Sequence, residues 1–247
     1  QTMIGKNHSK YFDENSWLYF TKEVFDLLYP SYGDTYPTYN GAIGMTYEQA
    51  GHSRGGLAVE TEDGDTLTLN DRLTHHFTTG LSTIEVASKN VDKILLEFSK
   101  FFKESKKNPP GKYSAYIISK NNNKDKIKDL QNWLDNNGIE HGLASTSKSI
   151  KGFSYLKGET EQLKVAKGDM IISARQAKSV LVQILFEPQT TLRDSLTYDI
   201  TAWSIPYVFG LNTYAVKSDI KFSKARYFSP RNEIADQSPY ALSLIHI

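Results

Sequence analysis

The sequence predicts an α/β protein in two parts: a mixed-sheet part that ends in a long helix, followed by a small open α/β domain. Three observations predict this class. Apolar residues recur at steps of three and four from about Asn70 to about Lys106, which is the pattern of one long amphipathic helix. Residues 113–144 carry the pattern of a strand, a helix and a second strand. Between the two, "KESKKNPPGK" combines lysines with two prolines and a glycine, as linkers do.

The linker at residues 108–112 divides the chain. Residues 1–107 form the first part, residues 113–220 form an accessory α/β domain, and residues 221–247 are a tail to which the sequence assigns no structure. A chain of 247 residues with 39% hydrophobic and 12% aromatic residues can bury a substantial core.

Composition and charge restrict the class of protein. The 29 basic residues are balanced by 28 acidic ones, so the chain lacks the broad positive charge that nucleic-acid binding needs. No apolar run approaches the roughly 18 residues that span a bilayer. Without cysteine, the chain can form no disulfide and no thiolate metal site. We therefore expect no nucleic-acid partner and no insertion into a membrane.

The first part has three segments before its long helix. Residues 17–28 carry apolar residues at helical spacing and predict a helix that ends before Pro30. The next segment, "YPSYGDTYPTY", is a turn-rich loop whose tyrosines are typical of a pocket wall. The run "GAIGMTYE", residues 41–48, then predicts a short buried strand with Glu48 at its C-terminal end.

A predicted hairpin leads into the long helix. Residues 55–72 contain two extended runs around an Asp-Gly turn. The helix that follows carries an apolar stripe, which must pack on a sheet or on other helices. The members of this stripe are Leu73, Phe77, Leu81, Ile84, Ala87, Val91, Ile94, Leu95, Phe98 and Phe102.

The accessory domain begins with the strand "YSAYIIS", the helix "NKDKIKDLQNWLDNNG" and the strand "IEHGLA". Ile127, Leu130 and Leu134 are expected on the inner face of the helix, and Gly138 at its C-terminal cap. This order predicts a right-handed crossover between parallel, paired strands. "GDMIISA" and "AKSVLVQILF" repeat the strand and helix, and "KNNNKDK" is expected to be a solvated turn.

Glu48 is the candidate catalytic residue. Functional groups collect at the carboxyl ends of strands in open α/β sheets. A glutamate buried in such a site has a raised pKa, which suits it to take a proton from an attacking water and to return it to a leaving group. The alternative interpretation is a strand-end glutamate that accepts bonds from backbone amides or pairs with Arg54.

The stretch "FTKEVFDLLYPSYGDTYPTYNGAIGMTYEQAGHSRGG" resembles the zinc metallocarboxypeptidases of the carboxypeptidase A type, in particular a large secreted, Bacteroidetes-like branch. "SLTYDITAWSIPYVFGL" is similar to a segment downstream of the peptidase domain in that branch, so the resemblance covers roughly residues 5–216. It implies that residues 1–107 are the C-terminal part of the catalytic domain. Thr46, Tyr47 and Glu48 match the family's catalytic strand, with Glu48 as general base and then general acid on a zinc-bound water.

The resemblance also implies zinc as cofactor and a secreted or periplasmic location. The family takes its zinc ligands from a His-x-x-Glu pair and a later histidine, all N-terminal to the catalytic strand. This chain has no His-x-x-Glu, and none of its six histidines is a good candidate ligand. His75 and His76, for example, are adjacent on a helix and point about 100° apart. The ligands are therefore expected in a segment that precedes Gln1, and this chain alone is expected to be inactive.

The resemblance suggests substrate-binding residues as well, with a peptide or protein as the partner. The family caps the substrate carboxylate with a mobile tyrosine on a loop before the catalytic strand, and Tyr32, Tyr36 and Tyr39 lie in that region. Each of these tyrosines has a second interpretation, as a ring packed on the sheet edge. Arg54 could contribute a cation, or it could be an ordinary surface arginine.

A different class of protein remains as the alternative. The chain could be a catalytically inert module that binds a peptide or a glycan through the aromatic loop and the "YDITAW" segment. In that segment Asp199, Trp203 and Tyr207 could line a pocket edge. The other interpretation places Trp203, Ile205 and Phe209 in the core.

Overall fold

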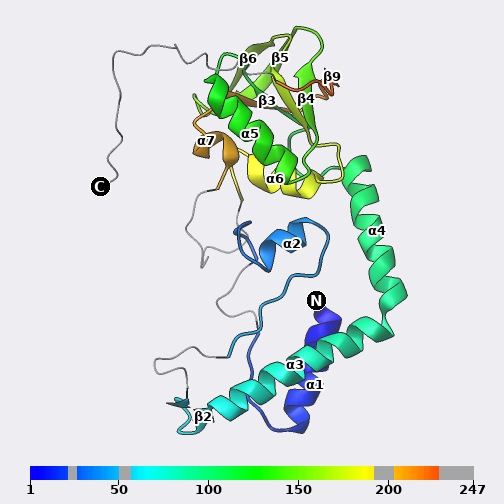
Figure 1. The fold of residues 1–247 in the computed structure, drawn as a ribbon, viewed down its shortest axis with the longest axis vertical. Helices are drawn as coiled ribbons and strands as arrows, with labels where there is room; N and C mark the ends of the chain where they lie inside the picture. The colour runs from blue at the N-terminus through cyan, green and yellow to red at the C-terminus, as the bar shows by residue number, and fades with distance from the viewer. Residues whose placement is uncertain (22–26, 50–56, 192–202, 228–247) are drawn as a thin grey trace, which may run out of the picture.

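The computed structural model describes residues 1–21, 27–49, 57–191 and 203–227. The chain is a mixed α/β protein with a large antiparallel sheet and several helices (Figure 1). The helices are α1 Thr2–Glu14, α2 Thr35–Tyr39, α3 Leu69–Lys89, α4 Val91–Lys107, α5 Lys124–Asn136, α6 Ser179–Phe186 and α7 Ile205–Val208. The strands are β1 Ala58–Glu60, β2 Thr66–Thr68, β3 Ala115–Ile118, β4 His141–Ala144, β5 Lys148–Ser154, β6 Glu159–Val165, β7 Met170–Ser173, β8 Thr213–Val216 and β9 Phe222–Ser223.

The main sheet has seven strands in the order β6-β5-β8-β3-β7-β4-β9. Every neighbouring pair in it is antiparallel. The predicted pairing of β3 with β4 is therefore wrong. The two strands do run in the same direction, but β7 lies between them and bonds to both.

Helices α5 and α6 cover one face of this sheet. The sequence pattern correctly predicts the buried face of α5. Ile127, Leu130 and Leu134 of α5 are fully buried, as predicted. They pack in one cluster with side chains of α6 and with Tyr116 of β3. Asn123 caps α5 by accepting hydrogen bonds from two backbone N–H groups, and Gly138 follows the helix with φ +64°.

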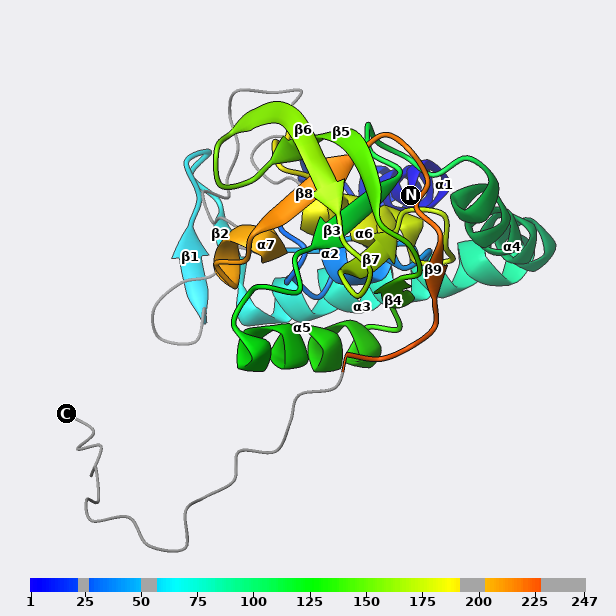
Figure 2. The ribbon, with the colours of Figure 1, turned by 90° about the horizontal axis from the view of Figure 1, so that it is seen from above.

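The opposite face is partly covered by the β5–β6 hairpin, whose ribbon is strongly curved (Figure 2). Ile150 and Leu163 of the hairpin pack in a second cluster with Ile117 of β3. The curvature depends on Gly152. A Cβ there would come within 2.6 Å of the Leu163 side chain and 2.8 Å of the Val216 side chain, so glycine allows the hairpin to approach β8 this closely without displacing them.

The first part differs more from its prediction. Residues 17–21, 27 and 28 are irregular, while residues 22–26 of the predicted helix lie outside the described part. A helix that the sequence pattern did not predict, α1, precedes them. The chain turns after α1 because Ser16 adopts φ +57° and the backbone N–H of Trp17 bonds to the carbonyl of Phe12. The Trp17 ring then packs edge-on against the Phe12 ring at 5.3 Å.

The predicted strand at residues 41–48 is also wrong. These residues are irregular, and Ile43 is 44% exposed. Two glycines explain the difference. Gly41 has φ +87°, which an extended strand does not use, and Gly44 lies so close to the backbone of Asp34 that a Cβ would meet its oxygen at 1.8 Å.

The hairpin β1–β2 is confirmed as an antiparallel pair. The helix after it is interrupted, however, so that α3 and α4 replace the single helix predicted. The interruption lies at Asn90, whose side chain donates to the carbonyl of Val86 at 2.8 Å and so caps the end of α3. The boundary at residues 108–112 stays a prediction.

Helix α3 packs against α1, but with its polar face (Figure 1). The buried residues of α3 are Arg72, His75, Thr79, Ser82 and Val86. The predicted apolar stripe is exposed instead, with Phe77 68% and Ile84 65% accessible. Within the described part of the chain, the expectation that the whole stripe packs on other elements is wrong, although Phe102 is half-buried and lies beside Gly41.

Candidate functional site

Glu48 lies in the irregular segment between α2 and the hairpin, and its side chain is exposed. The enclosed, buried setting predicted for this carboxylate is therefore not observed. In the part of the chain that the structure describes, its carboxylate makes no hydrogen bond and no ion pair. No backbone amide of the described residues holds the carboxylate, and the pairing with Arg54 stays a prediction because Arg54 lies outside the described residues.

The residues on either side of Glu48 are anchored to α1 and α3. The Tyr47 hydroxyl is 2.8 Å from the Thr83 hydroxyl, and its ring packs edge-on against the His8 ring at 4.8 Å. On the other side, Gln49 Oε1 lies 3.0 Å from Nδ1 of His75. The carboxylate is thus free while the backbone that carries it is held from both sides.

A polar network joins α1 to α3 beneath this segment. The buried Ser82 hydroxyl lies 2.9 Å from Nδ1 of His8 and 2.8 Å from Nδ2 of Asn7. Asn7 and Tyr11 donate to the Glu85 carboxylate at 2.8 and 2.9 Å. Because Ser82 is completely buried and His8 Nε2 has no partner, this serine and histidine form a structural contact rather than a nucleophile with its base.

The network predicts that the contact between α1 and α3 weakens in acid. Burial lowers the pKa of His8 and of His75. Hydrogen bonds from Lys89, Asn7 and Tyr11 lower the pKa of Glu85 to about 2. Both histidines resist protonation in the folded state, so their stabilising effect is complete above pH 6.5 and is lost as the pH falls below it. The Glu85 contribution is complete above pH 4.5 and is lost towards pH 2.

Amide hydrogen exchange of α1 measures this effect. We expect faster exchange at pH 5.5 than at pH 7.5, after correction for the intrinsic rate. In a His8→Gln, His75→Gln double variant the difference in exchange between pH 5.5 and pH 7.5 should largely disappear. Both histidines of lowered pKa are then absent, and Glu85 titrates at lower pH. An unchanged pH profile in the variant would contradict the role of the two histidines.

The three candidate tyrosines make contacts elsewhere. Tyr36 donates a hydrogen bond to Asn137 Oδ1 at 2.9 Å, which links α2 to the accessory domain. Tyr39 donates to the carbonyl of Leu28 at 2.8 Å, and the Tyr32 ring lies edge-on to the Tyr29 ring at 5.0 Å. None of these contacts involves Glu48.

Beside the main sheet, Ile205 is buried and Phe209 packs against the helix-side core, as the core interpretation predicts. The Trp203 indole N–H bonds to the carbonyl of Ile184 at 3.0 Å. Tyr207 is exposed on α7, and Asp199 lies outside the described residues.

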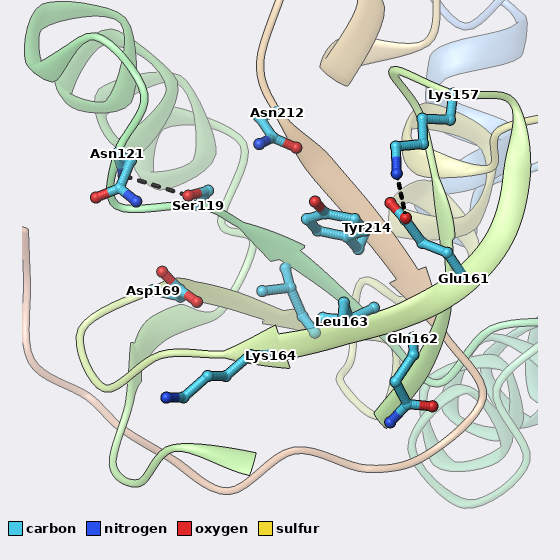
Figure 3. Close-up of a pocket in the computed structure, with 11 residues that line it drawn as sticks. Ser119, Asn121, Lys157, Glu161, Gln162, Leu163, Lys164, Asp169, Asn212 and Tyr214 are labelled. Atoms are coloured by element: carbon cyan, nitrogen blue, oxygen red, sulfur yellow. Dashed lines mark hydrogen bonds and ion pairs between the residues drawn. The ribbon is translucent and has the colours of Figure 1, made fainter. Parts of the chain in front are cut away.

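A second candidate site was not predicted. A cavity of about 380 Å³ lies between the β5–β6 hairpin and the ends of β3 and β8 (Figure 3). Its polar lining comes from Ser119, Asn121, Lys157, Glu161, Gln162, Lys164, Asp169, Asn212 and Tyr214. The segment "KNNNKDK", expected to be a solvated turn, supplies part of this wall. A run of three asparagines between a buried strand and a helix cap was the signal available in the sequence.

Metal binding and membrane insertion can be addressed only for the described residues. Among them, no three His, Cys, Asp or Glu side chains come together in a way that could hold a metal ion. No helix in the same residues has both the length and the apolar character needed to cross a membrane.

Comparison of the chain with protein-family models, with characterised proteins and with solved structures found no match.

Proposed function

We propose that this chain is the part of a zinc-dependent peptide hydrolase that supplies the general base, Glu48. One observation of the structure carries the proposal: the Glu48 carboxylate is exposed and has no partner among the described residues, while Tyr47 and Gln49 are anchored on either side of it. An accessible carboxylate on a segment that is held at both neighbouring residues can be reached by the water molecule from which a general base takes a proton. The resemblance around Thr46, Tyr47 and Glu48 supplies the reaction class.

The described residues do not fit zinc, because they contain no group of side chains able to hold it. The proposal therefore requires the ligands to come from another segment of the polypeptide. The exposed apolar stripe of α3 supports this requirement, since such a stripe is normally covered by another element. A peptide or protein is the substrate, and a secreted or periplasmic location belongs to the same proposal.

The test uses the protein as its own gene encodes it. We expect the purified protein to contain zinc and to hydrolyse peptides, to lose that activity with 1,10-phenanthroline, and to regain it when zinc is added. Hydrolysis that is insensitive to the chelator, or a protein that neither holds zinc nor cleaves peptides, would count against the proposal.

A second candidate function is a binding module without catalytic activity. The observation that favours it is the polar cavity beside Tyr214, which lies in the accessory domain and shares no residue with the Glu48 segment. The two functions are separable, because a multidomain hydrolase can carry a binding site of its own.

A further inference from the structure

The cavity beneath the β5–β6 hairpin has the dimensions of a small-molecule site. Its volume of about 380 Å³ lies in the range of ligand pockets, roughly 300 to 1,000 Å³. It opens on the sheet face opposite α5 and α6, and Ile117 and Leu163 contribute its apolar surface. The remaining lining is polar, so the ligand must offer many hydrogen-bonding groups.

Asn212 presents an unused acceptor at this cavity. Its Oδ1 atom is buried and has no hydrogen-bond partner. A buried acceptor without a partner costs free energy, and a ligand donor recovers it once the Asn212 side chain turns its Oδ1 atom towards the cavity. Its backbone, by contrast, is held firmly: the Asn122 side chain accepts from the Asn212 N–H at 2.7 Å and donates to the Asn212 carbonyl at 3.0 Å. Asn122 also donates to the carbonyl of Ser119. One side-chain amide therefore holds both the loop after β3 and the segment before β8, which line the cavity on two sides.

The charged groups at the cavity largely cancel or are already engaged. Lys157 pairs with Glu161. The Asp169 carboxylate accepts the backbone N–H groups of Lys120 at 3.0 Å and of Ala166 at 2.7 Å. Two lysines thus face two carboxylates in the lining, and only Lys164 has no partner among the described residues. A phosphorylated ligand would need a stronger cluster of cations, so this charge balance favours a neutral one.

Tyr214 supplies an aromatic surface in the middle of these polar groups. The β8 strand alternates, so that Ala215 faces the helix-side core while Tyr214 and Val216 lie on the cavity side. Figure 3 shows the Tyr214 ring between Asn212 and Leu163, with the ion pair of Lys157 on one side and Ser119 with Asn121 on the other. A tyrosine ring combines an apolar face with a polar edge.

We propose that this cavity binds a neutral carbohydrate. A sugar ring has one face of C–H groups, which suits the Tyr214 ring, and a rim of hydroxyl groups, each of which is both donor and acceptor. Those hydroxyls match the amides of Asn121 and Asn212, and one of them would donate a hydrogen bond to Oδ1 of Asn212. The inference is independent of the peptidase proposal, because it uses none of the residues of that site.

Isothermal titration calorimetry of the whole chain tests the inference with three neutral trisaccharides: cellotriose, mannotriose and N-acetylchitotriose. We expect at least one to bind with a dissociation constant of about 1 mM or lower, which is a binding free energy of about −4 kcal/mol. Tyr214→Ala should weaken that binding about tenfold through loss of the ring contact. Asn212→Leu should weaken it to a similar extent, because the leucine side chain has no acceptor.

Two further variants keep the test decisive. Asn121→Ala changes an exposed loop side chain and should fold normally while weakening binding, which covers the case in which Tyr214→Ala is unstable. Tyr207→Ala removes an exposed tyrosine that is not part of the cavity lining and should leave binding unchanged. The inference is overturned if none of the three sugars binds at 10 mM, if the cavity variants bind as tightly as the parent, or if only inorganic phosphate or triglycine binds.

Discussion

Glu48→Gln is expected to lower kcat/KM for peptide hydrolysis by the gene-encoded protein about 10²- to 10⁴-fold, which is the usual contribution of a general base. Glutamine has nearly the same shape but cannot take up a proton. Because the Glu48 carboxylate makes no hydrogen bond and no ion pair in the described part, the change should leave the folded structure intact. Steady-state kinetics together with the melting temperature of each protein measure both effects.

The matched control for Glu48→Gln is Glu62→Gln. Glu62 is also exposed, and it lies in the turn of the β1–β2 hairpin. The control removes the same charge from the same part of the molecule. Because the proposal gives Glu62 no role in catalysis, this variant should retain full activity. Full activity in both variants would rule out Glu48 as the base. The same loss of activity in both variants would show a general effect of charge instead.

Phe186→Ala is expected to reduce the free energy of unfolding of the protein by about 3 to 5 kcal/mol. The Phe186 side chain is fully buried, and its ring lies 5.5 Å from the Tyr116 ring. Its removal leaves a cavity between α6 and the sheet, which the surrounding side chains can fill only in part. Urea denaturation followed by far-UV circular dichroism measures the loss.

Phe77→Ala is the comparison for this core variant. Phe77 is of the same residue type but is 68% exposed on α3, so its replacement should change stability by no more than about 0.5 kcal/mol. A cost for Phe77→Ala comparable with that for Phe186→Ala would mean that the stripe of α3 is covered in solution. A small cost for Phe186→Ala would contradict the packing described for α6.

The helix α5 could be predicted because its signals are local. Ile127, Leu130 and Leu134 recur at the helical period, and Asn123 and Gly138 mark its two ends. The sheet order could not be predicted in the same way. The placement of β7 between β3 and β4 depends on contacts between residues far apart in the sequence, which periodicity does not record.

The first part shows a different reason for failure. The periodicity from Leu73 onward correctly predicts a helix with an apolar face, but α3 contacts α1 with its other face. Periodicity identifies which residues share a face but not whether a partner covers it. At residues 41–48 the small apolar side chains suggested a strand, while the backbone demands of Gly41 and Gly44 decided against it.

The candidate sites were predictable to unequal degrees. Glu48 was found through a short motif, and the structure adds that its carboxylate is accessible rather than buried. The cavity at Tyr214 was missed, because Asn121, Asn212 and Tyr214 come from segments separated by about ninety residues and meet only in the folded sheet. The run of three asparagines at residues 121–123 marks one wall of the cavity, but no local pattern shows that this wall meets Asn212 and Tyr214.

The interruption at Asn90 has a geometric consequence for whatever covers the apolar stripe. It splits one continuous row of side chains into two arms that diverge at an elbow (Figure 1). A single straight helix packed along α3 would leave the apolar side chains of α4 exposed, and the reverse also holds. A surface that covers the apolar residues of both α3 and α4 must therefore be bent, or must consist of two elements that meet near Asn90.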